Sequence, residues 1–220
     1  MKFTKDEIRK AMLLYAVTDQ MWLKVGETLV DVVESVLQNG ATFLQIREKD
    51  LAEDAFEAEA DRLKTLCARH KVPFVVNDSV EIALKINADG VHVGQSDIKG
   101  RDIRAIIGPD KILGISAGTV EEAVAAEKAG ADYIGVGAIF GTSTKKNARS
   151  MTMERLKEIV SSVSIPVVAI GGISAENISH LSGSGVDGVA VVSAIFAAEN
   201  PGKATADLLK LAEEVVASNG

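Results

Sequence analysis

Short apolar runs alternate with longer amphipathic segments along the whole chain. Eight of these runs have the length and composition of buried β-strands, and they lie at residues 13–18, 43–47, 74–77, 90–93, 112–116, 133–137, 167–170 and 188–192. The segments between them carry apolar residues at helical spacing, chiefly at 29–38, 52–69, 120–128, 153–160, 175–181 and 201–217. Asn200 suits the N-cap of the last helix, and Pro201 suits its first turn.

Eight strands that alternate with helices predict an α/β protein with a closed (β/α)8 barrel, the TIM barrel. Four similar phrases support this prediction, because each places Gly or Asn at a helix end just before a strand: Asn39-Gly-Ala, Asn87-Ala-Asp-Gly, Ala129-Gly-Ala-Asp and Gly185-Val-Asp-Gly. A doubly wound sheet is the alternative, but no glycine-rich turn follows the first strand. We expect a single domain over residues 1–220, with a short N-terminal leading helix.

Composition narrows the class of protein further. Hydrophobic residues make up 47% of the chain, with 19 Gly and 4 Pro, as in a compact α/β protein. The net charge of -7 argues against a general nucleic-acid binder. No apolar run is long enough to span a bilayer, and the charged N-terminus does not resemble a secretory signal. We therefore expect a soluble, cytoplasmic protein without a membrane partner. Its lone cysteine, Cys67, is interpreted as a structural thiol.

The last three predicted strands end in residues suited to binding anions. The apolar stretch that contains the sixth strand runs on to Gly141 and is followed by three hydroxyls and an ammonium group, and the next two strands end in glycine and serine. The groups concerned belong to Thr142, Ser143, Thr144, Lys145 and Ser193. Loops after the last strands of such barrels frequently hold phosphate, so we predict a phosphate site there.

A basic cluster follows the second strand. Because side chains alternate along a strand, Gln45, Arg47 and Lys49 share one side, and Ile46 and Glu48 share the other. A Gln, an Arg and a Lys directed at the barrel mouth are costly unless an anion meets them. The alternative is a solvated cluster at the start of the next helix, in which Lys49 pairs with a neighbouring carboxylate.

Two carboxylates come from neighbouring strand ends. Asp78 follows the third strand, and Asp97 follows the fourth. Mg²⁺ favours one or two carboxylates together with substrate phosphate oxygens and water, so this pair is a candidate metal site. Helix capping is the alternative for both residues, for Asp78 together with Ser79 and for Asp97 near Arg101.

The remaining polar candidates also lie at strand ends. Asn77 closes the third strand and Ser116 the fifth, so both would reach the barrel mouth. His92 lies within a strand, and we interpret it as a satisfied core or rim histidine rather than as an acid or base. His70 and His180 fit helix surfaces.

This set of residues is rich in anion binders and contains no convincing nucleophile. It favours chemistry that depends on positioning and charge neutralisation, such as the departure of a diphosphate. A second phosphate site without a metal would bring a second anionic substrate to the same mouth. Two such substrates suggest a transferase.

The chain resembles the thiamine-phosphate synthase family in segments that follow one another over almost its whole length. They are Tyr15-Ala-Val-Thr-Asp19, Gln45-Ile-Arg-Glu-Lys-Asp50, Val76-Asn-Asp78, Gly90-Val-His-Val-Gly-Gln-Ser-Asp97, Gly114-Ile-Ser116, residues 137–146 and Ala169-Ile-Gly-Gly-Ile173. No single motif is decisive, but the set is specific. The resemblance implies a (β/α)8 fold and the Mg²⁺-dependent coupling of hydroxymethylpyrimidine diphosphate with a thiazole phosphate, which gives thiamine phosphate and diphosphate.

The resemblance also implies residue roles. The pyrimidine diphosphate would contact Gln45, Ile46, Arg47, Glu48, Lys49, Asn77, Ser116 and Lys145, and the catalytic residues among them would be Arg47, Lys49, Ser116 and Lys145. Mg²⁺ would be held by Asp78 and Asp97. The thiazole phosphate would contact Thr142, Ser143, Thr144, Gly172, Val192 and Ser193. The implied mechanism is dissociative: the C–O bond to diphosphate breaks, and the thiazole nitrogen traps the pyrimidine cation.

Three residues depart from the family pattern without removing a proposed ligand, namely Gly141, Ser79 and Asn87. Two other readings stay open. A thiazole tautomerase on the same fold would not need the diphosphate cluster or the metal pair, and a non-catalytic barrel that binds a phospholigand would be expected to have lost some charged residues. A sugar-phosphate isomerase is disfavoured, because it has no use for the carboxylate pair. The oligomeric state, including a homo-oligomer, and the exact thiazole substrate stay open.

Overall fold

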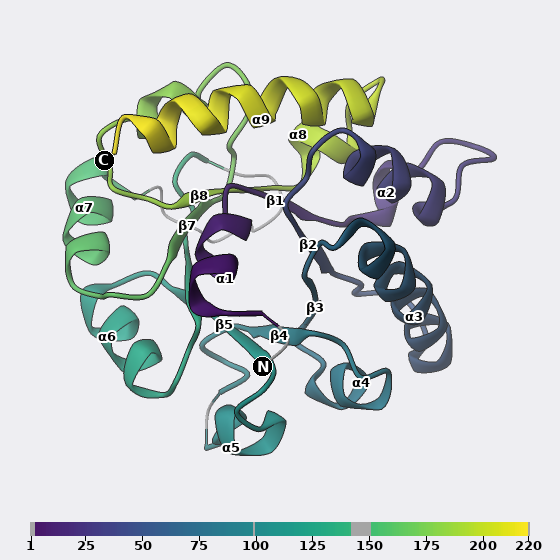
Figure 1. The fold of residues 1–220 in the computed structure, drawn as a ribbon, viewed down its shortest axis with the longest axis horizontal. Helices are drawn as coiled ribbons and strands as arrows, with labels where there is room; N and C mark the ends of the chain where they lie inside the picture. Colours follow the sequence, from purple (N-terminus) through teal and green to yellow (C-terminus); the bar gives the residue numbers. More distant parts are fainter. Residues whose placement is uncertain (1–2, 99, 142–150, 220) are drawn as a thin grey trace.

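The structure, a computed structural model, describes residues 3–98, 100–141 and 151–219. Eight parallel strands form a closed barrel in chain order, and the last pairs with the first (Figure 1). The strands are β1 (Leu14–Val17), β2 (Phe43–Ile46), β3 (Phe74–Asn77), β4 (Gly90–Val93), β5 (Ile112–Ala117), β6 (Tyr133–Val136), β7 (Val167–Ile170) and β8 (Gly188–Val191). The predicted (β/α)8 barrel is confirmed, and the doubly wound alternative is wrong, because that sheet would be open.

Helices surround the barrel on its outer face (Figure 1). They are α2 (Leu29–Gln38), α3 (Glu53–His70), α4 (Val80–Lys85), α5 (Ile103–Ile107), α6 (Val120–Lys128), α7 (Met153–Ser161), α8 (Ser193–Phe196) and α9 (Pro201–Ala217), with 3-10 turns η1 (Gln20–Trp22) and η2 (Ile178–Leu181). Most begin at a polar N-cap whose side chain accepts a backbone N–H of the first turn, as Asn200 does for α9. The capping prediction for Asn200 is confirmed.

One predicted helix is largely absent. The segment 175–181 forms only the short turn η2. The Asn177 side chain accepts the Ser174 N–H at 2.9 Å and donates to the Gly172 carbonyl at 2.8 Å. These local side-chain bonds satisfy backbone groups in an irregular loop, which competes with helix formation.

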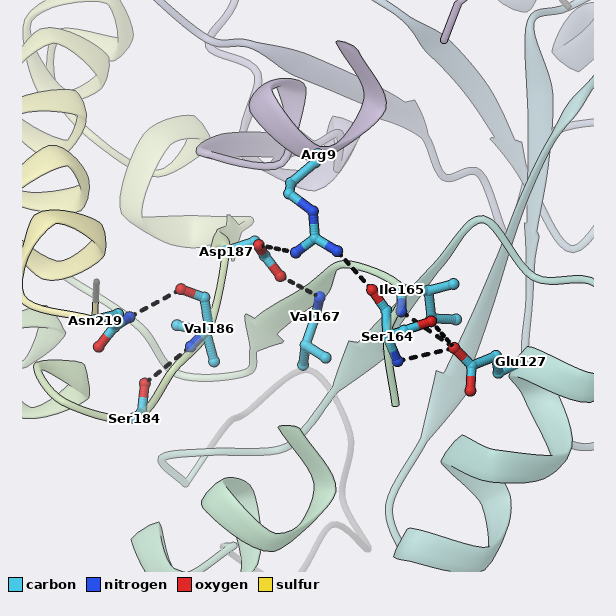
Figure 2. A network of polar contacts seen from close by, with 9 residues as sticks. All are labelled: Arg9, Glu127, Ser164, Ile165, Val167, Ser184, Val186, Asp187 and Asn219. Atoms are coloured by element: carbon cyan, nitrogen blue, oxygen red, sulfur yellow. Dashed lines mark hydrogen bonds and ion pairs between the residues drawn. The ribbon is translucent and has the colours of Figure 1, made fainter. Parts of the chain in front are cut away.

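The leading helix α1 (Lys5–Ala11) lies across the end of the barrel at which the strands begin, and Figure 1 shows it at the centre of the ring. Its buried residue Ile8 joins the core inside the barrel, as does Met12, which follows the end of the helix. Arg9 donates to the Asp187 carboxylate and to the Ser164 carbonyl, which lie just before β8 and β7 (Figure 2). The helix therefore closes the amino end of the barrel and leaves the opposite end to ligands.

Side-chain alternation divides the strands into two faces. In β2, Phe43 belongs to the core inside the barrel, whereas Leu44 and Ile46 pack in the layer between strands and helices. Tyr15 and Tyr133 are the corresponding inward residues of β1 and β6. Because inward positions recur every second residue, the carboxyl ends of all eight strands direct one set of side chains into a common space.

Candidate active site

A cavity of about 320 Å³ lies at the carboxyl ends of the strands. Its polar lining comes from several strands and the segments that follow them, and it includes Gln45, Arg47, Asn77, His92, Ser116 and Ser193. Apolar residues of β7 and β8 form part of the wall. A mostly apolar pocket with a few convergent polar groups is the usual form of a small-molecule site.

Side chains at the end of β2 point alternately into the cavity and towards the helices, as period-two alternation predicts. Gln45 and Arg47 line the cavity, whereas Ile46 is buried towards the helices. Thr18, which is fully buried at the end of β1, accepts the Arg47 N–H at 3.0 Å and so fixes the backbone from which this guanidinium extends. Lys49 lies beyond the strand end and is exposed. Neither Lys49 nor Glu48 is part of the cavity lining.

A buried hydrogen-bond chain runs from Gln45 to Ser116. Gln45 Nε2 donates to Tyr15 Oη at 2.5 Å, and the two tyrosine hydroxyls are 2.8 Å apart. His92 joins the chain through Nδ1, 2.9 Å from Tyr133 Oη, and through Nε2, 2.9 Å from Ser116 Oγ. Both ring nitrogens thus have partners, in line with the interpretation of this histidine as a satisfied buried residue.

The two tyrosines of this hydrogen-bond chain were not among the site residues predicted from the sequence. A signal was available, because the protein contains two tyrosines and both fall on inward-facing strand positions. Gly114 makes room for the contact between strands: a Cβ at this position would lie 2.3 Å from Tyr133 Oη and 2.5 Å from His92 Nδ1. The glycine in the Gly114-Ile-Ser116 motif is therefore required by packing.

The two candidate metal ligands, Asp78 and Asp97, interact with each other. Burial raises the pKa of Asp78, and the negative charge of Asp97 and a hydrogen bond with it raise that pKa further. Asn77, which donates to Asp78 at 2.7 Å, and the Arg47 guanidinium act in the opposite direction. Two adjacent carboxyls that oppose each other's ionisation fit a divalent cation, which would relieve the repulsion.

The capping alternatives for these aspartates are not what the structure contains. Ser79 caps α4 by accepting the Ile82 N–H, and Asp102 caps α5. Asp97 instead accepts the Gly94 N–H at 2.9 Å within a turn. Among the described residues, no group of three or more His, Cys, Asp and Glu side chains could hold a metal ion. A cation held here would therefore depend on other oxygen atoms, such as those of a phosphate.

The opposite wall of the cavity contains Gly172, Val192 and Ser193. Gly172 has φ +69, and a Cβ there would lie 2.6 Å from the Gly141 carbonyl oxygen, so only glycine allows this approach of two loops. The structure brings these three predicted residues together. The other predicted anion binders, Thr142, Ser143, Thr144 and Lys145, lie outside the described residues.

The three departures from the family pattern have local explanations or little consequence. Asn87 has φ 53, a left-handed conformation that Asn tolerates better than most residues. Ser79 caps α4. A Cβ at Gly141 would meet nothing within 4 Å, so space does not restrict this position to glycine.

The fold and the cavity define a (β/α)8-barrel protein with a pocket at the carboxyl ends of its strands, lined by polar groups that include Arg47 and by apolar residues of β7 and β8. The family model described as "Thiamine monophosphate synthase" matches residues 14–195. The chain belongs to this family, as its motifs predict.

Individual relatives agree with this assignment. The chain is 48% identical over 198 residues to the thiamine-phosphate synthase of Ruminiclostridium cellulolyticum, which covers 90% of this chain and 94% of the relative. It is 48% identical over 195 residues to the Clostridium botulinum protein of the same name, covering 89% and 91%. The solved structure of thiamine phosphate pyrophosphorylase from Pyrococcus furiosus is 40% identical, with a TM-score of 0.86, covering 95% of this chain and 99% of that one. No helix within the described ranges is long and apolar enough to cross a membrane.

Proposed function

We propose that this protein is a thiamine-phosphate synthase, which couples hydroxymethylpyrimidine diphosphate with a thiazole phosphate and releases diphosphate. The activity is the transfer of a pyrimidinylmethyl group, as in the thiamine-phosphate synthases that are 48% identical to the chain over 198 and 195 residues. The observation that carries the proposal is a cavity with Arg47 and Asn77 at one wall and a glycine and serine wall opposite. The carboxyls of Asp78 and Asp97 do not line this cavity but lie close enough to Arg47 to interact with it electrostatically through Asp78. Two anionic substrates would meet between these walls.

The diphosphate belongs at the wall formed by β2, β3 and β4. Arg47 acts there electrostatically on Asp78, so the guanidinium and the carboxylate pair share one neighbourhood. We assign Arg47, Lys49, Ser116 and Lys145 as catalytic groups, Lys49 and Lys145 on the strength of the sequence motif alone. Gln45 and Asn77 line the cavity and are further substrate contacts. Ile46 and Glu48 do not line it, and their place among the contacts rests on the motif. Asp78 and Asp97 would hold Mg²⁺, which when bound neutralises charge on the diphosphate as it leaves.

The thiazole phosphate belongs at the wall formed by β6, β7 and β8. Gly172, Val192 and Ser193 line that part of the cavity. Backbone N–H groups of loops with positive-φ glycines and the start of α8 are suited to phosphate oxygens. We place Thr142, Ser143 and Thr144 in the same subsite on the strength of the sequence motif.

The reaction is dissociative. The C–O bond between the pyrimidine methylene and the diphosphate breaks with its electron pair on the diphosphate oxygen, and the thiazole nitrogen then donates its lone pair to the resulting carbon cation. No proton has to leave the nitrogen, so no general base is required. The polar groups in the cavity fit this scheme: Glu122 accepts the Gly118 N–H at 2.6 Å, and His92 is held at both ring nitrogens.

The related thiazole tautomerase activity is not favoured. An isomerase would bind a thiazole phosphate without breaking a diphosphate bond, and it would have no use for the interacting pair of Asp78 and Asp97 beside Arg47. The similarity to the thiamine-phosphate synthase of Ruminiclostridium cellulolyticum extends over 90% of the chain.

A diphosphate-release assay tests the proposal. We expect release only when both substrates and Mg²⁺ are present, and a loss of roughly tenfold or more in Asp97→Asn, since a metal site with two carboxylates loses one. Asp207→Asn is the matched control, because Asp207 pairs with Lys203 on the exposed face of α9. Absence of diphosphate release, with interconversion of thiazole isomers in its place, would falsify the proposed function.

A further inference from the structure

The hydrogen-bond chain between Gln45 and Ser116 has a direction. Its two ends line the cavity, as do Tyr15 and His92, and the buried Tyr133 completes the connection between them. The chain therefore links two separate parts of the cavity wall through the barrel interior. Whether Ser116 offers a ligand a hydrogen-bond donor or an acceptor therefore depends on how the Gln45 amide is oriented at the other end.

Each tyrosine hydroxyl has a single proton to donate. Burial raises the pKa of Tyr15 and raises that of Tyr133 well above its usual value, so both phenols keep their protons at any ordinary pH. A phenol that accepts a hydrogen bond from one neighbour gives its proton to the other. The orientation of one member of the chain thus fixes the orientation of the next.

The starting point is the Gln45 amide, which presents Nε2 to Tyr15. An amide nitrogen can only donate, so Tyr15 accepts from it and donates to Tyr133. Tyr133 in turn donates to His92 Nδ1. The imidazole then carries its proton on Nε2 and donates to Ser116 Oγ. The serine hydroxyl keeps its own proton for the cavity.

We propose that Tyr15 and Tyr133 are positioning residues that make Ser116 a hydrogen-bond donor and the Gln45 amide oxygen an acceptor at the two ends of the chain. A ligand ring between them would offer an acceptor nitrogen to Ser116 and a donor group to Gln45. A neutral amino-substituted heteroaromatic ring has both. Only this identification of the ring rests on the proposed function, in which one substrate is a pyrimidine.

Packing holds the aromatic rings of the hydrogen-bond chain in fixed positions. Phe43 packs against Tyr15, with ring centroids 4.4 Å apart, and against Tyr133 at 5.6 Å. Backbone at Gly114 approaches Tyr133 and His92 so closely that no methyl group fits between them. With the rings fixed, only the hydroxyl and imidazole protons can move. Because each hydroxyl has one proton to donate, the direction of donation changes only if all the bonds reverse together.

The location of the proton on His92 reports this direction in the protein without substrates. The two nitrogens of a neutral imidazole have well-separated ¹⁵N chemical shifts, and the His92 signals can be assigned by their loss in His92→Asn. In the wild-type protein at pH 8 we expect the proton on Nε2. A proton on Nδ1 would overturn the assigned direction. The measurement is made on the wild-type protein, and His92→Asn serves only to assign the signals.

Gln45→Glu should reverse the chain. A carboxylate can only accept, so Tyr15 would donate to it, Tyr133 to Tyr15, and the His92 proton would move to Nδ1. Gln45→Glu combined with Tyr15→Phe is the matched control, because the interrupted chain leaves the proton on Nε2. If the His92 proton stayed on Nε2 in Gln45→Glu, or if it moved to Nδ1 in both variants, transmission through the tyrosines would be refuted.

Kinetics supply a second measurement. Tyr133→Phe should raise the KM for the pyrimidine diphosphate roughly two- to tenfold, the range for one hydrogen bond, and leave the KM for the thiazole phosphate unchanged. Equal changes in both KM values would indicate a general loss of packing and contradict the positioning role. If the wild-type protein released no diphosphate, the proposed function would fail while the NMR result on His92 would stand.

Discussion

Glu48 carries a carboxyl group whose protonation should be visible in the stability of the protein. The side chain is half-buried outside the cavity lining, and its Oε1 has no hydrogen-bond partner among the described residues. Burial raises its pKa from 4.5 to about 7, and the nearby negative charges of Asp19 and Glu59 contribute. Gln20 and Arg47 offset part of this shift.

The sign of the effect follows from the direction of the shift. The folded protein holds the Glu48 proton more tightly than the unfolded chain, so protonation stabilises the fold. This contribution is fully present below pH 4.5 and is lost as the pH rises to about 7. The shift corresponds to about 3.4 kcal/mol if taken in full, and solvent screening of a half-exposed group reduces it to about 1.5 kcal/mol.

Glu48→Gln removes this titration. We expect the variant to match the wild-type protein near pH 4.5 and to exceed its free energy of unfolding by about 1.5 kcal/mol above pH 7. Urea unfolding at half-unit steps from pH 4.5 to 8.5 measures the difference. Glu213→Gln, on the exposed side of α9, is the control and should show no pH-dependent gap. If the difference in free energy of unfolding between Glu48→Gln and the wild-type protein stayed constant with pH, or widened towards acid, the raised pKa of Glu48 would be refuted.

Three further predictions concern single side chains. Arg47→Ala should raise the KM for the pyrimidine diphosphate roughly ten- to hundredfold and spare the thiazole phosphate; steady-state kinetics with each substrate varied would expose a reversed assignment of the subsites. Gly114→Ala should destabilise the protein by about 2 kcal/mol in urea unfolding, because the new Cβ would lie 2.2 Å from Tyr133 Cζ; an unchanged midpoint would contradict that crowding. Arg104→Met should cost about 3 kcal/mol in the same assay, since it leaves the largely buried Asp132 without its ion pair, and a neutral result would show that the pair contributes little.

Strand-length apolar runs that alternate with helix-length amphipathic segments predicted the barrel. Period-two alternation within the second strand separated Gln45 and Arg47 from Ile46, as the structure confirms. The same rule fails at Lys49, because period-two alternation holds only while the backbone is extended, and β2 ends at Ile46. Beyond that point a side chain's direction depends on the loop.

The buried chain of tyrosines could not be predicted in the same way. Tyr15 and Tyr133 are 118 residues apart, and their contact depends on how the closed barrel staggers its strands. That stagger is a property of the whole ring and leaves no local pattern in the sequence. The carboxylate pair could be predicted from the sequence, because Asp78 and Asp97 follow adjacent strands. Parallel pairing of these strands places their ends side by side.

The helix that closes the amino end of the barrel is synthesised before every strand that it covers. Arg9 precedes its partner Asp187 by 178 residues, so the contact cannot form until the segment that leads into β8 has left the ribosome. Until then Ile8 and Met12 have no barrel interior to enter, and the growing sheet has open edges. A nascent chain arrested before residue 187 should therefore bind chaperones that recognise apolar segments, and release of the last strand should end that binding by closing the ring and seating the helix in one step.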